Sequence, residues 1–146
     1  MTAELMAHAD QVMARTYTRF PLVFSKGQGS TLFDSSGRSY LDFVAGIAVC
    51  NLGHAHPKLS RALADQAGSL WHVSNLYYTI PQIELADWLV KHSFADRVFF
   101  GNSGAEANEA AIKLARRYFN ERNEAGRFRI ITMERSFHGR TMATLS

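Results

Sequence analysis

Two short polar turns hold the residues whose types and spacing could do chemistry. The first, Gly101–Glu106, follows the apolar run Val98–Phe100 and opens a stretch with helical periodicity. Ser103 and Glu106 have the three-residue spacing of a capping box. A helix that begins this way presents free N–H groups and the positive end of its dipole, which favour phosphate binding. The alternative is an ordinary capped turn, and the pattern matches neither the P-loop nor the G-x-G-x-x-G sequence.

The second turn, Glu134–Thr141, follows the apolar segment Phe128–Met133 and carries Phe137, His138 and Arg140. If both apolar segments are parallel strands of one sheet, both turns lie at its carboxyl edge, where α/β proteins bind ligands. A phosphate site, an aromatic face and a guanidinium together suit a flat aromatic cofactor that carries a phosphate, with a carboxylate as substrate.

A small set of elements must position these turns. We expect Arg97–Gly101 and Phe128–Met133 to be strands of one sheet, with a helix from about Ser103 to Arg122 crossing between them. Earlier in the chain, the patterns predict helices over residues 3–16, 57–68 and 81–92, strands over 22–24, 31–34 and 39–43, and a loop over 71–79. The helix over 81–92 is expected to turn Ile83, Leu85, Ala86, Trp88 and Leu89 largely inward.

Composition narrows the class of protein. Hydrophobic residues make up 47% and charged residues 20% of the 146 residues, which is ordinary for a globular protein. The net charge of +3 is spread along the chain, so we expect no nucleic-acid partner. The lone cysteine, Cys50, excludes an internal disulfide, and neither a secretory signal nor a membrane span is evident. The pair His54 and His56 lacks surrounding carboxylates or cysteines, so we predict a structural turn and no metal.

Five segments stand out along the chain: Tyr40–Val49, Leu52–Pro57, Ser74–Tyr78, Asn102–Glu109 and Ser136–Thr141. In this order they resemble motifs of the class III aminotransferases, which depend on pyridoxal 5'-phosphate. The resemblance runs from about Tyr17 to the last residue, and five motifs in the right order make it specific. The resemblance implies a fold-type-I transferase, an α/β protein built in three layers (α/β/α).

The resemblance also implies roles for particular residues. Three residues at the helix start would hold the cofactor phosphate: Ser103, Gly104 and Ala105. Phe137 would stack on the pyridine ring, and Arg140 would pair with a substrate carboxylate, for which a planar fork serves better than a lysine. The alternative for Arg140 is that it caps its own turn or pairs with Glu134. His138 is expected to position the turn rather than touch the cofactor.

Part of the catalytic machinery is expected outside this chain. Family members are much longer, and their Schiff-base lysine and the aspartate that pairs with the pyridine nitrogen match no residue here. The chain's lysines lack the family context: Lys26, Lys58, Lys91 and Lys113. We therefore expect no catalytic residue and no transamination by this chain alone. Because Ser146 falls inside an expected helix, we interpret the chain as part of a larger protein. Residues 1–75 would be an N-terminal arm and small-domain segment. Residues 76–146 would be the first part of the large, cofactor-binding domain.

For the complete enzyme, the resemblance implies transfer of an amino group from N2-acetylornithine to 2-oxoglutarate, in arginine biosynthesis. Ornithine, succinylornithine and 4-aminobutyrate are alternative amino donors. It further implies a cytoplasmic homodimer with Ser74–Tyr78 near the subunit interface. A hypothesis from another class is a non-catalytic module that binds a phosphate ligand or another subunit. Downstream sequence with a strand-end aspartate and a later lysine would favour the enzyme.

Overall fold

The computed structural model describes residues 2–145 of the 146-residue chain. The chain divides into two compact units, Met1–Val73 and Ser74–Ser146. This division falls close to the boundary after residue 75 that the sequence predicts. The assignment of each unit to a small or a large domain stays a prediction.

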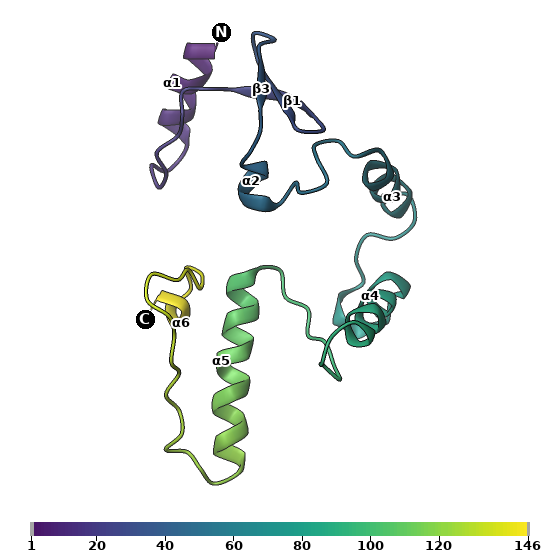
Figure 1. Cartoon of the computed structure of the whole chain (residues 1–146), viewed down its shortest axis with the longest axis vertical. Coiled ribbons are helices and arrows are strands. Elements are labelled where there is room, and N and C mark those ends of the chain that lie inside the picture. Colours follow the sequence, from purple (N-terminus) through teal and green to yellow (C-terminus); the bar gives the residue numbers. More distant parts are fainter. Residues whose placement is uncertain (1, 146) are drawn as a thin grey trace. The chain divides into compact units, whose positions relative to one another are not determined.

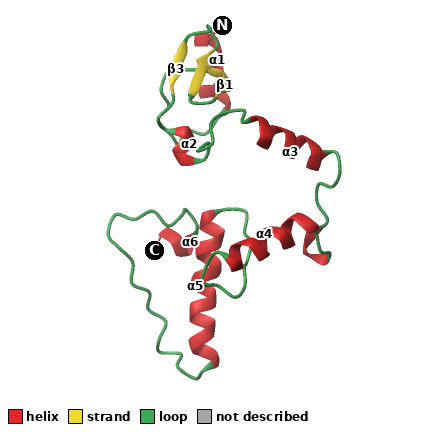
Figure 2. Ribbon diagram, turned by 45° about the vertical axis from the view of Figure 1, so that its right-hand side comes forward, coloured by secondary structure: helices red, strands yellow, loops and turns green. Residues whose placement is uncertain are grey.

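The first unit contains a small sheet and three helices, two of which the sequence predicts (Figures 1 and 2). The helices are α1 (Thr2–Val12), α2 (Ala45–Ala48) and α3 (Pro57–Ala67). The helix expected over residues 3–16 is present but ends at Val12. The helix expected over residues 57–68 is confirmed, with Pro57 in its first turn and Gly68 as its C-cap.

The sheet consists of three antiparallel strands in the order β1-β2-β3. The strands are β1 (Phe24–Gln28), β2 (Thr31–Asp34) and β3 (Ser39–Leu41). The strand predicted over residues 31–34 is confirmed, and the one predicted over 39–43 ends two residues early. The strand predicted over 22–24 is misplaced, because β1 runs on through Gly27 and Gln28. Gly29 reverses the chain instead, with φ of 54°, so that Gln28 pairs with Thr31.

A buried carboxylate, Asp34, holds the turn between β2 and β3 and is only 4% exposed. Its Oδ1 accepts hydrogen bonds from the Ser36 N–H (2.9 Å), the Ser36 hydroxyl (2.7 Å) and the Arg38 N–H (3.0 Å). Its Oδ2 accepts from Arg38 Nε (2.8 Å) and the Tyr40 hydroxyl (2.9 Å). These hydrogen bonds, that of the Ser36 side chain foremost, hold the pKa of Asp34 well below its ordinary value.

The short helix α2 is strained. All four of its residues have φ between 49° and 65°, in the left-handed region. This conformation costs on the order of 1 kcal/mol for each non-glycine residue and is least favourable for a β-branched side chain such as Ile47. Asp42 supports the entry to α2, because its Oδ1 accepts from the N–H groups of Val44 and Ala45, both at 2.9 Å.

The second unit is helical apart from its connections. Its elements are the 3-10 turn η1 (Ser74–Leu76), α4 (Ile80–Lys91), α5 (Gly104–Glu121) and α6 (Met142–Leu145). Figure 1 shows the chain reversing after α5 and running back beside that helix to α6, near the start of α5. The helices predicted over residues 81–92 and 103–122 are confirmed within one or two residues at each end.

The prediction that Arg97–Gly101 and Phe128–Met133 are strands of one sheet is wrong for this chain. The only sheet among residues 2–145 is β1-β2-β3. Phe99 of the first segment lines a pocket of about 540 Å³ against α5, and Ile130 of the second lines a different pocket of about 380 Å³ against the same helix. A strand exists only where a neighbour completes its hydrogen-bond ladder. The structure pairs neither segment with the other or with any strand of that sheet, so neither forms a strand.

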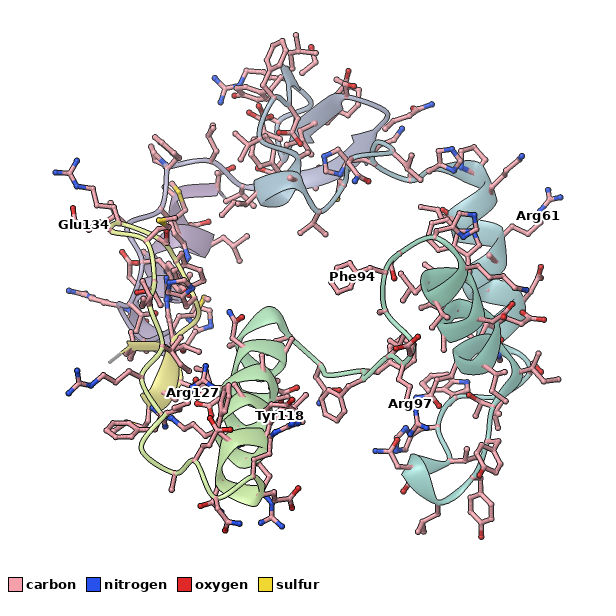
Figure 3. The ribbon with its side chains drawn as sticks, turned by 60° about the horizontal axis from the view of Figure 1, so that its bottom comes forward. Arg61, Phe94, Arg97, Tyr118, Arg127 and Glu134 are labelled. Carbon is pink, nitrogen blue, oxygen red and sulfur yellow. The ribbon has the colours of Figure 1, made fainter. Side chains whose placement is uncertain are left out.

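The apolar side chains of residues 2–145 remain accessible, and none of them is buried. The accessible surface is 13389 Å², whereas two compact domains of half this mass would expose about 9000 Å² together. Ile83 and Trp88 of α4, expected to face inward, are 53% and 57% exposed. Phe94 stands clear of the ribbon in Figure 3. The predicted apolar faces are present but uncovered. No helix within residues 2–145 is long and apolar enough to cross a bilayer.

We predict that Asp34→Asn in the complete protein loosens the β2–β3 turn. The amide NH2 group of asparagine donates hydrogen bonds, so it would face other donors in place of one of the two carboxylate oxygens that accept from Ser36, Arg38 and Tyr40. Amide hydrogen exchange at Ser36 and Arg38 should be faster in the variant at neutral pH. The pKa of Asp34 is lower in the folded state than the unfolded value of about 3.9. The stabilisation is therefore complete above that value and is lost as the pH falls further. Equal exchange rates in the two proteins at neutral pH would contradict this role.

Candidate functional site

The start of α5 has the capped geometry that the sequence predicts. Ser103 is the N-cap residue, with extended backbone angles, and its hydroxyl oxygen accepts from the Glu106 N–H at 3.2 Å. Glu106 Oε2 in turn accepts from the Asn102 N–H at 2.5 Å. A standard capping box returns this second bond to the N-cap residue itself. Here it goes one residue earlier, which ties the preceding turn to the helix.

The first two N–H groups of α5 are available to a ligand. They belong to Gly104 and Ala105 and have no acceptor within the helix, since its first hydrogen bond joins the Ala107 N–H to the Ser103 carbonyl. A methyl group placed on Gly104 would meet no atom of residues 2–145 within 4 Å. The space over the helix start is therefore open. The 18-residue helix directs the positive end of its dipole into that space.

The second turn lies directly against this helix start. Gly139 has φ of 134°, and a methyl group on it would come within 2.7 Å of Ala105 Cβ and 2.8 Å of Thr144 Oγ1. Asn108 Nδ2 donates to the carbonyl oxygen of His138 at 2.6 Å. The two polar turns therefore meet, as predicted, although the strands expected to bring them together do not form.

A second tether joins α5 to the chain after the turn. Glu109 Oε1 accepts from the Ala143 N–H at 3.2 Å, and Glu109 Oε2 lies 3.6 Å from Lys113 Nζ. The hydrogen bond from the Thr141 side chain is the main cause of a lowered pKa at Glu109. The Ala143 N–H and the charge of Lys113 act in the same direction. Glu109 is therefore a charged residue that links α5 to the start of α6.

The predicted ring and guanidinium lie side by side on the turn. Phe137 is 78% exposed, and the guanidinium carbon of Arg140 is 5.9 Å from the centre of its ring. His138 is partly buried and lines the pocket of about 380 Å³ beside α5. Its Nε2 is buried and has no hydrogen-bond partner among the described residues. Phe137 and Arg140 thus face outward, while His138 faces α5.

Of the pair His54 and His56, His54 is hydrogen-bonded within the first unit. His54 Nε2 lies 2.7 Å from Asp42 Oδ2, and this hydrogen bond is the main cause of a lowered pKa at Asp42. A methyl group on Gly27 would come within 2.6 Å of the His54 ring, so only glycine fits there. His56 is the N-cap residue of α3. Within residues 2–145, no three histidines, cysteines or carboxylates gather in a group that could hold a metal ion.

Sequence reasoning missed the two tethers, Asn108 and Glu109. Asparagine is a poor residue for a helix interior, so its place in the second turn of α5 was an available signal. Glu109 has an i,i+4 partner in Lys113, and this local pairing hides its contact 34 residues away. Lys113 lies about 13 Å along the axis from Gly104 and is 76% exposed. It is therefore not placed to bond a group at the helix start.

The arrangement can bind a compound with two anionic groups and a flat ring. One anion would take the N–H groups of Gly104 and Ala105, and the other the guanidinium of Arg140. The exposed face of Phe137 offers a stacking surface between aromatic systems. The second unit holds no lysine at the helix start, so it supplies binding and orientation.

Comparisons with known proteins give a consistent result. The family Aminotransferase class-III matches residues 12–146. Acetylornithine aminotransferase of Synechocystis sp. is 60% identical over an alignment of 146 positions, which covers 96% of this chain and 33% of the relative. A crystal structure of N-acetylornithine aminotransferase from Stenotrophomonas maltophilia is 46% identical with a TM-score of 0.71, over 81% of this chain and 31% of that one.

A crystal structure of ornithine aminotransferase from Toxoplasma gondii is 29% identical with a TM-score of 0.87, over 99% of this chain and 34% of that one. The predicted α/β fold class of a fold-type-I transferase is therefore confirmed. The chain spans about a third of the length of the curated relatives it matches.

We predict that Gly139→Ala destabilises the complete protein by about 1–3 kcal/mol, because it combines an unfavourable φ with a clash against Ala105. The matched control is Gly126→Ala, since Gly126 has no positive φ and a methyl group placed on it would meet no atom within 4 Å. That control should stay within about 0.5 kcal/mol of the parent or gain slightly. Urea unfolding measures both. Equal midpoints for the two variants would refute the close approach of the turn to α5.

Proposed function

Because the chain belongs to the class III aminotransferase family, we propose that it is part of a pyridoxal-phosphate-dependent enzyme. The reaction would transfer the amino group of N2-acetylornithine to 2-oxoglutarate. The observation that carries this proposal is the meeting of the open helix start with the turn that bears Phe137 and Arg140, through Asn108 and the Gly139–Ala105 contact. The name of the Synechocystis relative, at 60% identity, supports the choice of substrate.

The residues at the start of α5 fit the phosphate of pyridoxal 5'-phosphate. The N–H groups of Gly104 and Ala105 would donate to phosphate oxygens. The Ser103 hydroxyl accepts from the Glu106 N–H, so its own proton remains for a third hydrogen bond. The open space at Gly104 gives the phosphate access to the backbone. When bound, the cofactor supplies an electron sink for the amino-transfer chemistry, and the protein supplies orientation and electrostatics.

The turn would hold the ring and the substrate. Phe137 offers its face to the pyridine ring, which limits the ring to one plane. Arg140 would bind the α-carboxylate of acetylornithine through its planar fork, leaving the distant amino group to reach the reacting carbon. Residues 2–145 orient both partners in this scheme. The base that moves the proton lies outside them.

Two alternatives remain distinguishable. An amino donor such as ornithine, succinylornithine or 4-aminobutyrate would fit the same anchors, and the Toxoplasma structure is that of an ornithine aminotransferase. The comparison of kcat/KM among these donors decides between them. A non-catalytic module that binds a phosphate ligand is less well supported, because the family match covers residues 12–146.

We also propose that the complete protein is a cytoplasmic homodimer with Ser74–Tyr78 near the subunit interface. What supports this is the run of polar and aromatic side chains in that short segment, in which Tyr77 and Tyr78 are exposed, together with membership of the family. Light scattering of the active, full-length protein at micromolar concentration should give twice the subunit mass. A monomer under these conditions would contradict the proposal.

Arg140→Ala tests the substrate role. In the full-length enzyme, we expect kcat/KM for acetylornithine to fall. The loss of transition-state stabilisation should be about 2–4 kcal/mol, which is typical of removing one partner of a desolvated charge pair. The absorbance of the bound cofactor should hardly change, because Phe137 and the start of α5 are intact. Arg140→Lys keeps the charge but loses the planar fork, so its activity should lie between that of the parent enzyme and that of Arg140→Ala.

The competing interpretation is that Arg140 only caps its turn or pairs with Glu134. It predicts a small loss of activity, similar for all amino donors. A fall in kcat/KM of less than about threefold, or under 1 kcal/mol, would show that Arg140 does not bind the carboxylate.

A further inference from the structure

We infer that Asn108 and Glu109 are positioning residues that set the place of Arg140 relative to the start of α5. They would thereby fix the spacing between the carboxylate site and the phosphate site. The inference rests on the proposed function, since it assigns the carboxylate to Arg140. Neither residue is expected to touch substrate or cofactor.

The first tether acts just before Arg140. Asn108 Nδ2 donates to the His138 carbonyl oxygen at 2.6 Å, across 30 residues of sequence, and this contact is partly buried. A carbonyl two residues before Arg140 is thus held from the second turn of α5. The adjacent Gly139 lies against Ala105, which prevents the turn from moving closer.

The second tether acts just after Arg140. Glu109 Oε1 accepts from the Ala143 N–H at 3.2 Å, across 34 residues. The Glu109 side chain is only 19% exposed, whereas the Lys113 side chain beside it is 76% exposed. The turn is further closed on itself, because the Thr141 N–H donates to Thr144 Oγ1 at 2.9 Å. Arg140 therefore lies between two fixed points on one helix.

Both binding sites are in this way positioned by α5. Asn108 and Glu109 lie one turn of helix beyond Gly104 and Ala105, or about 6 Å along the axis. A helix is stiff over this length. The tethers therefore fix the distance between the phosphate site at the start of α5 and the carboxylate site at Arg140. Because a misplacement of about 1 Å can cost about 10²-fold in rate, such a distance is a determinant of substrate use.

A purely structural role would have a different signature. If the tethers only stabilise the fold or the cofactor site, their loss would lower activity toward every amine alike. If they position Arg140, their loss would weaken only compounds that carry the carboxylate. The substrate without its carboxylate, N-acetyl-1,4-diaminobutane, separates these outcomes.

The experiment uses the full-length, cofactor-loaded protein. Asn108→Asp replaces the donor by an acceptor that faces the His138 carbonyl, and Glu109→Ala removes the second tether. Glu109→Gln keeps an oxygen within reach of the Ala143 N–H and serves as the conservative rescue. Lys113→Gln is the matched control, because it removes the other partner of Glu109 and leaves both tethers intact.

Two readouts are compared. Calorimetry measures the Kd of N-acetylnorvaline, which has the carboxylate but no reacting amine. Kinetics measure kcat/KM for acetylornithine and for N-acetyl-1,4-diaminobutane. We expect Asn108→Asp and Glu109→Ala to raise the Kd, and to lower kcat/KM for acetylornithine, by about tenfold or more. The value of kcat/KM for N-acetyl-1,4-diaminobutane should change less than about threefold in these two variants. Glu109→Gln and Lys113→Gln should resemble the parent in both readouts.

Equal losses for both amines, or an unchanged Kd, would overturn the inference. If Asn108→Asp does not fold, the comparison of Glu109→Ala with Glu109→Gln decides alone. A parent protein that binds N-acetylnorvaline but does not transaminate acetylornithine would refute the proposed function, and the Kd values would still test the positioning role.

Discussion

The close approach of Gly139 to Ala105 is the contact on which the candidate site depends. No side chain other than hydrogen fits between the turn and the helix, since a methyl group would lie 2.7 Å from Ala105 Cβ. Only at this separation can Asn108 reach the His138 carbonyl and Glu109 reach the Ala143 N–H. Arg140 lies between these two tethers, and Phe137 directly precedes the first of them. A single glycine thus fixes the geometry of several side chains that are distant in sequence.

Local signals in the sequence predicted the part of the site that local energetics determine. Ser103 and Glu106 cap α5 because their spacing, three residues apart, suits the first turn of any helix. The roles of Asn108 and Glu109 could not be read in the same way, because their partners lie 30 and 34 residues away. The left-handed course of α2 was equally hidden, since Ile47 has no intrinsic preference for a positive φ.

The failed strand predictions have a different cause. Arg97–Gly101 and Phe128–Met133 have the apolar character of buried strands, but strand formation depends on neighbours that this chain does not provide. In the first unit, β2 formed where predicted and β3 began where predicted, because they are joined by a short turn that Asp34 holds. Helices need no partner for their hydrogen bonds, so α4 and α5 match the sequence pattern almost residue for residue.

The uncovered apolar faces of α5 bear on how such a protein is synthesised. Relatives such as that of Synechocystis are about three times as long, so two thirds of their length lies outside this segment. At roughly 5–20 residues per second, translation of that much chain takes about 15–60 s. A segment that waits for these other parts can complete its helices but not its core, and Phe99 stays exposed in the meantime. Apolar surface that stays exposed in this way makes an incompletely synthesised chain prone to aggregation, which is the hazard that chaperones counter.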